Sequence, residues 1–483
     1  MSDIQLSAPG AVVPPGGRTL GRGLLLVMLT VGMVMATVQL LFAPDHLSPV
    51  YISGCVFLAL VTCILMIVYR ATGFKPVNWL SVEIIFIVML FLVHFWYPLS
   101  WLMGATASTD KVWINEAIVC KATMIAAIGL IAFCIGFHLP RDRFHVIRRA
   151  SYLDGAALFK LKAGGNIVFF VGMFFALLFL ILRPSQARYY ETGGYSQGLV
   201  FVLGIMGIQM GGLLLTIAGA RLYGKWRIGT VAKCVSVLYV LMALIEGYRS
   251  PVALVVLTVA AAYSEYIKHI SFKKIVVVIV SALIVLGIVG VGRHARERSL
   301  SGFMSAVSES KELSWRSGID SLGASVNCLY LAVDTVPSRY PFFHGVLQGS
   351  QMVTAIPWSS QLFPWALPEF GSSSIFFTWL KDPNMGSGAG STIIADMYIE
   401  FGTPSVFVEM FLLGMMFKYI QQKARATDGL IWNVAHATLI PTAAILVRNQ
   451  TLMLLRDVGW PVVGVLLMTW VMGIPRRAAQ PRP

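Results

Sequence analysis

Long apolar runs recur along almost the whole chain, and short polar segments separate them. Most runs have roughly 20 residues, the length at which a helix crosses a hydrocarbon core about 30 Å thick. The pattern predicts an all-α polytopic membrane protein with about 12 transmembrane helices. The expected spans are 24–43, 49–69, 79–98, 117–138, 166–182, 198–220, 230–246, 251–267, 275–292, 396–420, 429–447 and 452–474.

The polar segments between these runs divide the chain into unequal parts. One external segment, 293–395, is far longer than the other connections, and loops of such length tend to be functional. We expect a disordered cytoplasmic tail at 1–22, a membrane domain at 23–292, a large periplasmic loop at 293–395, further spans at 396–474 and a cytoplasmic tail at 475–483.

The composition agrees with a membrane protein, because 57% of the 483 residues are hydrophobic and only 12% are charged. The net charge of +15 does not indicate nucleic-acid binding, since its Lys and Arg residues gather in alternate loops. Excess Lys and Arg mark cytoplasmic loops, which places both termini in the cytoplasm. The basic loops are 18–22, 70–75, 141–162, 221–227, 268–274, 418–425 and 476–482.

Sequence motifs for metals, nucleotides and disulfides are missing from the chain. The six cysteines form no C-x-x-C pair, and neither an H-E-x-x-H motif nor a Walker or dinucleotide fingerprint occurs. We therefore expect no metal site and no cofactor.

Arginines occur in the external segments, against the positive-inside tendency. The planar fork of arginine donates two parallel hydrogen bonds and suits a phosphate or pyrophosphate. Contact with ordinary lipid headgroups would account for some of these arginines, whereas a convergent site for a lipid-linked pyrophosphate would account for all of them. The external arginines singled out are Arg183, Arg188, Arg249, Arg293, Arg296, Arg339 and Arg448.

Acidic residues and one histidine are the candidate bases. Glu246 precedes Arg249 by three residues, and the two either pair to tether a tight hairpin or face a ligand. Asp396 and Glu400 are spaced i, i+4 and share one face of a helix. They either complement the arginines, act as a general base, or suit the dipole of a helix N-terminus. His344, in the large loop, is the other candidate base.

Aromatic residues accompany these polar groups in the external segments. The large loop is rich in Trp, Tyr and Phe, which either build a small core or interfacial belt, or stack on sugar faces. The sugar-stacking candidates are Tyr189, Tyr190, Trp358 and Trp365.

The overall pattern resembles bacterial O-antigen and exopolysaccharide repeat-unit polymerases of the Wzy type. Such chains have a short arginine-bearing loop in the first half and one large external loop in the second. The local matches are G-Y-R at 247–249, V-P-S-R-Y-P-F-F-H-G at 336–345, A-I-P-W at 355–358 and S-T-I-I-A-D-M-Y-I-E-F-G-T-P at 391–404. The family's spacing of Arg, ten residues and Gly fits Arg183 to Gly194, but Arg339 to Gly349 is one residue short.

The resemblance implies a GT-C-like architecture in the bacterial inner membrane, with the active site on the periplasmic side. It implies a glycosyltransferase that moves a growing glycan from undecaprenyl pyrophosphate onto a lipid-linked repeat unit, without a nucleotide sugar. Its partners would be the undecaprenyl-pyrophosphate-linked donor and acceptor, membrane lipids, and candidates such as a chain-length regulator protein and a flippase. The open alternatives are an O-antigen ligase with the same donor, a lipid-linked oligosaccharide flippase, and a scaffold without catalysis.

Overall fold

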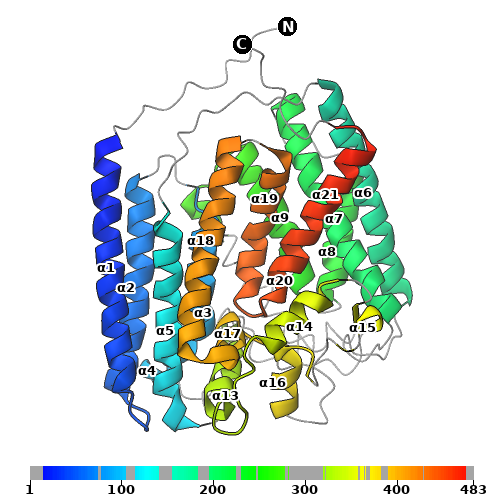
Figure 1. The fold of residues 1–483 in the computed structure, drawn as a ribbon. Coiled ribbons are helices and arrows are strands. Elements are labelled where there is room, and N and C mark those ends of the chain that lie inside the picture. Colours follow the sequence, from blue (N-terminus) through cyan, green and yellow to red (C-terminus); the bar gives the residue numbers. More distant parts are fainter. Residues whose placement is uncertain are drawn as a thin grey trace.

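The structure, a computed structural model, is helical, and no strand occurs among the residues that it describes. Figure 1 shows long helices side by side in a bundle, with a layer of short helices across its lower end. The described residues are 15–73, 78–104, 115–140, 155–182, 195–224, 230–245, 249–277, 281, 319–320, 322–356, 359–363, 365, 370–381, 390–427 and 429–474.

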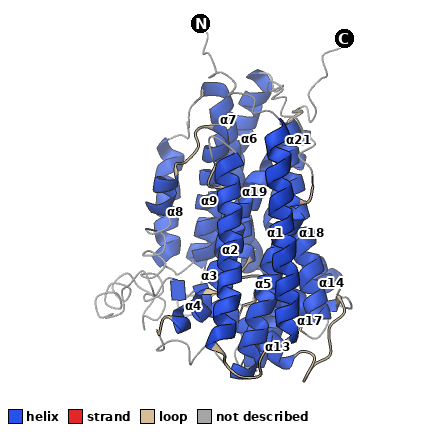
Figure 2. Cartoon of the chain, turned by 90° about the vertical axis from the view of Figure 1, so that its left-hand side faces the viewer, coloured by secondary structure: helices blue, strands red, loops and turns tan. Residues whose placement is uncertain are grey.

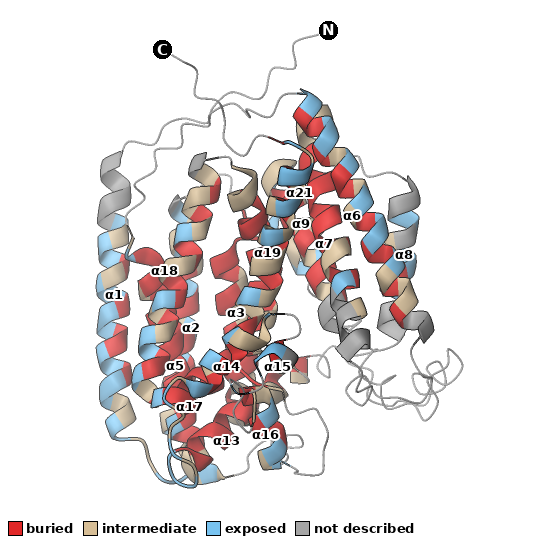
Figure 3. Cartoon of the chain, turned by 45° about the vertical axis from the view of Figure 1, so that its right-hand side comes forward, coloured by how far each residue is buried: buried red, intermediate tan, exposed pale blue. Residues whose placement is uncertain are grey.

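The first part of the bundle surrounds one buried helix, α5. In the most apolar stretch of α5, 83% of the residues are buried, against 17% in α1. Apolar residues of α1 such as Val27, Val31 and Val34 are exposed, as on a lipid-facing helix, whereas α5 is buried. Figure 2 shows α1 and α2 in front of the bundle, and Figure 3 shows exposed positions along α1. The helices of this part are α1 (Pro15–Leu41), α2 (Pro49–Gly73), α3 (Val82–His94), α4 (Trp96–Leu102) and α5 (Glu116–His138).

The second part of the bundle has its own apolar clusters, which join its helices to the C-terminal ones. Helices α6 and α7 lie so close that a Cβ atom on Gly172 would be 2.5 Å from the backbone nitrogen of Ile208. Small residues at such crossings let membrane helices approach each other. This part contains α6 (Gly155–Leu182), α7 (Tyr195–Tyr223), α8 (Thr230–Ile245), α9 (Arg249–Tyr266), α19 (Leu430–Leu446), α20 (Leu452–Leu454), a π-helical turn (Leu455–Gly459) and α21 (Trp460–Val471). Helix α18 (Thr403–Thr427) shares the core of the first part and packs against α5.

The short helices at the lower end form what we call the outer layer, defined as the segment from Ala324 to Phe401. Its helices α13 and α17 share a core with α5 and α18, so the layer is packed onto the bundle. Its elements are a 3-10 turn (Ala324–Val326), α13 (Asn327–Thr335), α14 (Val346–Thr354), α15 (Ser359–Leu362), α16 (Ser373–Lys381) and α17 (Ile393–Phe401).

A break at Gly402 divides the expected span 396–420 into α17 and α18. Gly402 has a φ of 75°, a conformation that side chains disfavour. A Cβ atom there would also lie 3.1 Å from the ring of Phe342. The new helix then starts with Thr403 and Pro404, because proline is tolerated in a first turn. Asp396 and Glu400 consequently lie outside the α18 span.

The expected all-α polytopic class is confirmed, but the count of about 12 spans is not. Among the described residues, 7 helices are long and apolar enough to cross a membrane, or up to 8 if the pair α3–α4, bent by 52°, is one span. Two expected spans form shorter apolar helices, Val252–Tyr266 and Leu430–Leu446. Most of the expected span 275–292 lies outside the described residues.

Helices α5 and α18 meet with almost no space between their backbones. A Cβ atom on Gly136 would overlap the Phe411 carbonyl oxygen, and one on Gly414 would overlap the Phe133 carbonyl oxygen. A backbone atom cannot rotate aside as a side chain can, so even one added methyl group must separate the helices.

We therefore expect Gly136→Ala to lower the thermal unfolding midpoint of the detergent-purified protein. Overpacking a core costs about 1–3 kcal/mol, and this backbone clash should lie at the upper end of that range. The matched control is Gly54→Ala in α2, where a Cβ atom would meet nothing within 4 Å. An equal midpoint for both variants would contradict the close packing of α5 and α18.

Candidate functional site

The outer layer lies at the end of the bundle where α1 joins α2, α9 begins and α19 turns into α20 (Figure 1). Several segments that the sequence analysis expects to be external therefore share one end of the molecule. The beginning of α1 and the end of α21 lie at the opposite end.

Asp396 is fully buried at the start of α17 and joins three parts of this region. Its Oδ1 accepts a hydrogen bond from Nε2 of Gln351 at 2.8 Å. Its Oδ2 accepts from the backbone nitrogen of Thr451 at 2.9 Å and from the Thr451 hydroxyl at 2.8 Å. The carboxylate thus ties α17 to α14 and to the α19–α20 turn. All three donors point at it, so its acceptor capacity is largely used.

Glu400, one helical turn further on, is also fully buried and holds the N-terminus of α14. Its Oε2 accepts from the backbone nitrogen of Gly345 at 2.6 Å, and its Oε1 accepts from that of Gln348 at 2.8 Å. A carboxylate at a helix N-terminus satisfies N–H groups that lack partners inside the helix. Within the described part of the chain, neither Glu400 nor Asp396 forms an ion pair with arginine.

Two glutamines of α14 complete this arrangement, and the sequence analysis did not single them out. Gln351 donates to Asp396, and its Oε1 accepts from the backbone nitrogen of Leu452 at 3.4 Å. Gln348 donates from Nε2 to Oε2 of Glu409 in α18 at 2.7 Å. The segment V-L-Q-G-S-Q-M-V-T offers a weak signal, because its two glutamines are three residues apart and share one helix face.

A second set of buried polar side chains joins α16 to the same region. The Ser373 hydroxyl lies 3.2 Å from the Ser391 hydroxyl and donates to Oε1 of Gln450 at 3.2 Å. Gln450 lies directly before Thr451, the partner of Asp396. The α19–α20 turn is therefore held from two sides by buried hydrogen bonds, which makes it a rigid support.

Arg448 lies on this rigid turn and is half-buried. Its Nε donates to the Ser325 hydroxyl at 2.8 Å. The structure thus positions Arg448 between the start of the outer layer and the end of α19.

Arg249 is the first residue of α9, and only its backbone is described. Ile445, near the end of α19, packs against the apolar cluster that contains Val252 and Val255 of α9. Helix α9 therefore begins, and helix α19 ends, at the same end of two packed helices. Arg249 is the first residue of α9, and Arg448 follows the end of α19. The structure brings these two predicted arginine positions to one end of a helix pair.

His344 is exposed and lies beside the C-terminal end of α17. Its φ is 53°, and its backbone N–H donates to the Glu400 carbonyl oxygen at 3.0 Å. Its ring lies 5.4 Å from the ring of Phe401, centroid to centroid. The turn that carries His344 is thus held by α17, while its imidazole remains open to solvent.

Two other predicted residues lie at the periphery. The side chain of Arg339 is 70% exposed, and its Nη2 lies 3.8 Å from Oδ2 of Asp334. Trp365 is 81% exposed and makes an edge contact with Phe363. The remaining predicted residues lie outside the described residues: Arg183, Arg188, Tyr189, Tyr190, Glu246, Arg293, Arg296 and Trp358.

The described residues contain no group of three or more His, Cys, Asp and Glu side chains arranged to hold a metal ion. The described residues of this region instead form a rigid frame of buried carboxylates and amides. Arg448, on the α19–α20 turn, is fixed at the edge of this frame. Such a frame can orient cationic groups towards an anionic substrate.

The hydrogen bonds of Asp396 predict that replacing its carboxylate with an amide lowers the stability of the protein. In Asp396→Asn an amide NH2 replaces one oxygen and must face a donor, which leaves a buried group unsatisfied and costs about 1–3 kcal/mol. We expect a lower thermal unfolding midpoint in detergent. The control is Asp45→Asn, at an exposed position at the same end. Equal midpoints for the two variants would contradict the role of Asp396.

The buried carboxyl of Glu400 leads us to predict that the free energy of unfolding depends on pH. Burial raises the pKa of the Glu400 carboxyl, its two backbone donors counteract this, and the nearby charge of Asp396 adds to it. Between the ordinary pKa of 4.5 and the raised value, the folded protein holds a proton that the unfolded chain has released. This contribution to stability is present at acidic pH and is lost as the pH rises through the folded-state pKa.

The measurement is the unfolding midpoint against pH for the wild type and Glu400→Gln. The variant should be less stable throughout, because its amide faces a backbone donor, but the fall above pH 4.5 due to Glu400 should disappear. Parallel curves for the two proteins would show that Glu400 titrates normally.

Comparison with known proteins assigns the chain to a family. Neither curated proteins nor solved structures give a match to it. One family model, described as O-antigen polysaccharide polymerase Wzy, matches residues 24–474, which is nearly the whole length. The match includes the helical bundle from Leu24 onward, the outer layer and all the predicted site residues. The chain belongs to the Wzy family of O-antigen polysaccharide polymerases.

Proposed function

We propose that this protein polymerises undecaprenyl-pyrophosphate-linked oligosaccharide repeat units into O-antigen or exopolysaccharide at the periplasmic face of the bacterial inner membrane. The observation that carries the proposal is the convergence of arginine-bearing segments at the end covered by the outer layer. There Arg448 is fixed on a rigid turn, and Arg249 begins the adjacent helix.

The arginines bind the donor pyrophosphate. Arg448 and Arg249 hold the diphosphate at the membrane surface. We assign Arg183, Arg188, Arg293 and Arg296 to the same substrate, because the sequence predicts that their segments are external. Arg339, exposed and next to Asp334, makes a weaker contribution at the rim. Guanidinium groups suit the task because they stay charged and donate in a fixed fork.

In the reaction, a hydroxyl of the acceptor sugar attacks C1 of the first sugar of the donor glycan. The C1–O bond to the pyrophosphate breaks as the new glycosidic bond forms, and undecaprenyl pyrophosphate leaves with the bonding electrons. The negative charge on the leaving group therefore grows in the transition state. Preorganised cations that meet this charge commonly contribute 10²–10³-fold each to the rate, as an order of magnitude.

A base takes the proton of the attacking hydroxyl. Among the four candidates, Asp396 and Glu400 already accept hydrogen bonds from fixed donors and are closed off from solvent, so we assign them to positioning. His344 is exposed on a turn held by α17, and Glu246 lies three residues from Arg249. We assign the base to one of these two; general bases are usually worth about 10²–10⁴-fold.

The aromatic residues complete the substrate site. Trp365 exposes its ring at the outer layer, and Tyr189, Tyr190 and Trp358 occupy segments expected on the same side. Their flat faces suit the apolar faces of sugar rings. In this proposal both termini are cytoplasmic, and donor and acceptor reach the site from the outer leaflet.

The test is a reaction of the purified protein with a lipid-linked repeat unit, read by mass spectrometry. We expect the wild type to produce a ladder of chain lengths. Arg448→Ala and Arg249→Ala should reduce product by about 10²–10³-fold, and Arg339→Ala by much less. The matched control is Arg221→Ala, in the last turn of α7 and next to a loop expected to be cytoplasmic. This variant should still produce the ladder of chain lengths.

The products also separate the alternatives. A single transfer of finished glycan to a lipid A core acceptor, with no ladder, would indicate a ligase. Movement of the lipid-linked unit between vesicle leaflets without new bonds would indicate a flippase. A ladder that survives in Arg448→Ala and Arg249→Ala would overturn the assignment of the arginines while leaving polymerisation intact.

A further inference from the structure

Helix α14 of the outer layer carries polar residues on its buried side and apolar residues on its exposed side. Ser350 and Gln351 are buried against the rest of the layer. Val346 and Met352, on the other side of the helix, are 53% and 56% exposed. Ile356, just after the helix, is also exposed. This distribution is the reverse of that in a helix with one face on a core and the other in water.

Hydrogen bonds within the layer account for the polar residues on the buried side. Gln351 donates to Asp396, and the Ser350 hydroxyl donates to the carbonyl oxygen of Gly371 at 2.9 Å. The exposed side has no comparable partners, and the sequence has no charged residue between Val346 and Trp365. An apolar surface without charges is unfavourable in water and favourable against lipid.

Two hydrogen bonds fix the level of α14 along the bundle. Nε2 of Gln348 donates to Oε2 of Glu409 at 2.7 Å, and Glu409 lies about 9 Å inside the N-terminal end of the α18 span, at 1.5 Å per residue. Nε1 of Trp460 donates to the carbonyl oxygen of Ala355 at 2.9 Å. Trp460 lies about 12 Å inside the N-terminal end of its own span.

This level lies within the thickness of a membrane. The α18 span, Thr403–Arg425, is about 35 Å long, only slightly more than a hydrocarbon core of about 30 Å. Helix α14 therefore lies beside two membrane spans and not beyond their ends. Figure 1 shows it at the lower end of the bundle, below α20 and not aligned with the long helices.

The exposed side of α14 also continues the apolar surface of these two spans. Close to Glu409, α18 exposes Val408 and Leu412. Beyond Trp460, α21 exposes Val463 and Leu467. Since exposed apolar residues on a membrane span face lipid, the surface of α14 between the two spans is part of the same lipid-facing surface.

We propose that the exposed side of α14 lies in the membrane, at the boundary between the headgroups and acyl chains of the leaflet on the outer-layer side. Amphipathic helices bind at this boundary with their apolar face about 5–10 Å deep. The hydrogen bond from Gln348 then satisfies Glu409 at a depth where an unpaired polar group is costly. Because the exposed side carries no charge, the contact does not require anionic lipid.

This membrane contact requires only that α18 and α21 are spans, so it does not depend on the polymerase reaction. In the proposed function the leaflet is the outer one, from which donor and acceptor arrive. Helix α14 then lies between that leaflet and the buried frame around Asp396 and Glu400.

The test is the fluorescence of the full chain in phosphatidylcholine nanodiscs, with an environment-sensitive fluorophore attached to Met352→Cys. Cys234, the exposed one of the six free cysteines, is replaced by serine in every variant. We expect phosphatidylcholine with a nitroxide near the top of its acyl chain to quench most of the fluorescence, and iodide in the buffer to quench little. Val346→Cys provides a second position and should give the same result.

The matched control is Arg339→Cys in the same layer, where the side chain is 70% exposed and paired with Asp334. Iodide should quench this label, and the nitroxide lipid should not. Leu412→Cys on α18 marks the response of a lipid-facing position. Quenching of the α14 labels by iodide and not by the nitroxide lipid would place this side in water and overturn the proposal. Protection from both quenchers would overturn it too, since another segment or a second copy would then cover α14.

Discussion

Two buried carboxylates on one short helix hold the outer layer together, and one of them, Asp396, also connects it to the membrane bundle. Each charge is removed from water at a considerable cost and must be met by donors whose positions are fixed. Asp396 is met by Thr451 of the α19–α20 turn and by Gln351 of α14, and Glu400 by the first N–H groups of α14. Neutral donors, not arginines, satisfy these acids in the described part of the chain. Moving one element away would leave a charge unsatisfied, so the carboxylates fix the relative positions of α14, α17 and α19.

The break at Gly402 is what makes this arrangement possible. If α17 and α18 formed one straight helix, Asp396 and Glu400 would continue the line of a membrane span. The positive φ of Gly402 ends the first helix, and α18 starts again after it. The turn after α13 then follows the end of α17, with Phe343 and His344 donating to the carbonyl oxygens of Ile399 and Glu400. A single flexible residue thus separates the helix that spans the membrane from the helix that organises the layer.

The parts of this architecture that depend on local pattern could be predicted from the sequence. Apolar runs such as 117–138 indicated a helix within a residue of the observed α5, and the spacing of Asp396 and Glu400 correctly indicated one helix face. The partners of these acids could not be predicted in this way. Gln351 and Thr451 lie 45 and 55 residues from Asp396, and no periodic pattern relates positions so far apart. The motif F-G-T-P contained the signal for the break, since glycine favours positive φ and proline favours a first turn.

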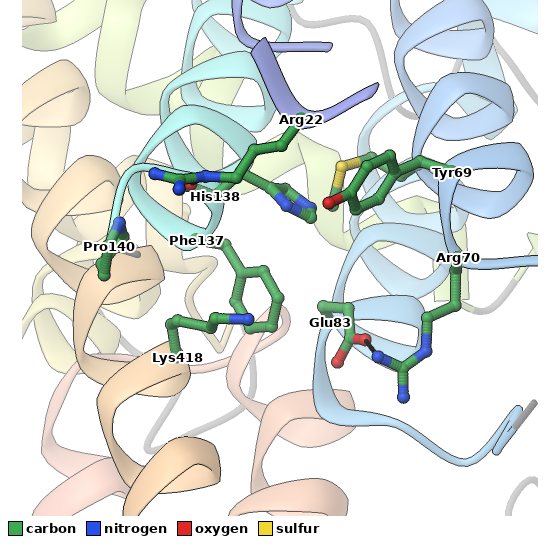
Figure 4. Close-up of a pocket in the computed structure, with 9 residues that line it drawn as sticks. Arg22, Tyr69, Arg70, Glu83, Phe137, His138, Pro140 and Lys418 are labelled. Carbon is green, nitrogen blue, oxygen red and sulfur yellow. Dashed lines mark hydrogen bonds and ion pairs between the residues drawn. The ribbon is translucent and has the colours of Figure 1, made fainter. Parts of the chain in front are cut away.

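The two ends of the molecule use charge in opposite ways, and this bears on where chemistry can occur. At the end of the bundle opposite the outer layer, Glu83 of α3 is paired with Arg70 of α2 (Figure 4), so arginine and carboxylate neutralise each other within the helix bundle. At the outer layer, the buried acids are satisfied by amides and hydroxyls, and Arg448 is held by the neutral Ser325 hydroxyl. In the described part of the chain these acids are satisfied without arginine, so this end of the molecule does not require an arginine to neutralise them. In the proposed reaction, a cation that holds the diphosphate and meets the charge of its departure needs a rigid support to aim it, and the buried hydrogen bonds around the α19–α20 turn would supply one.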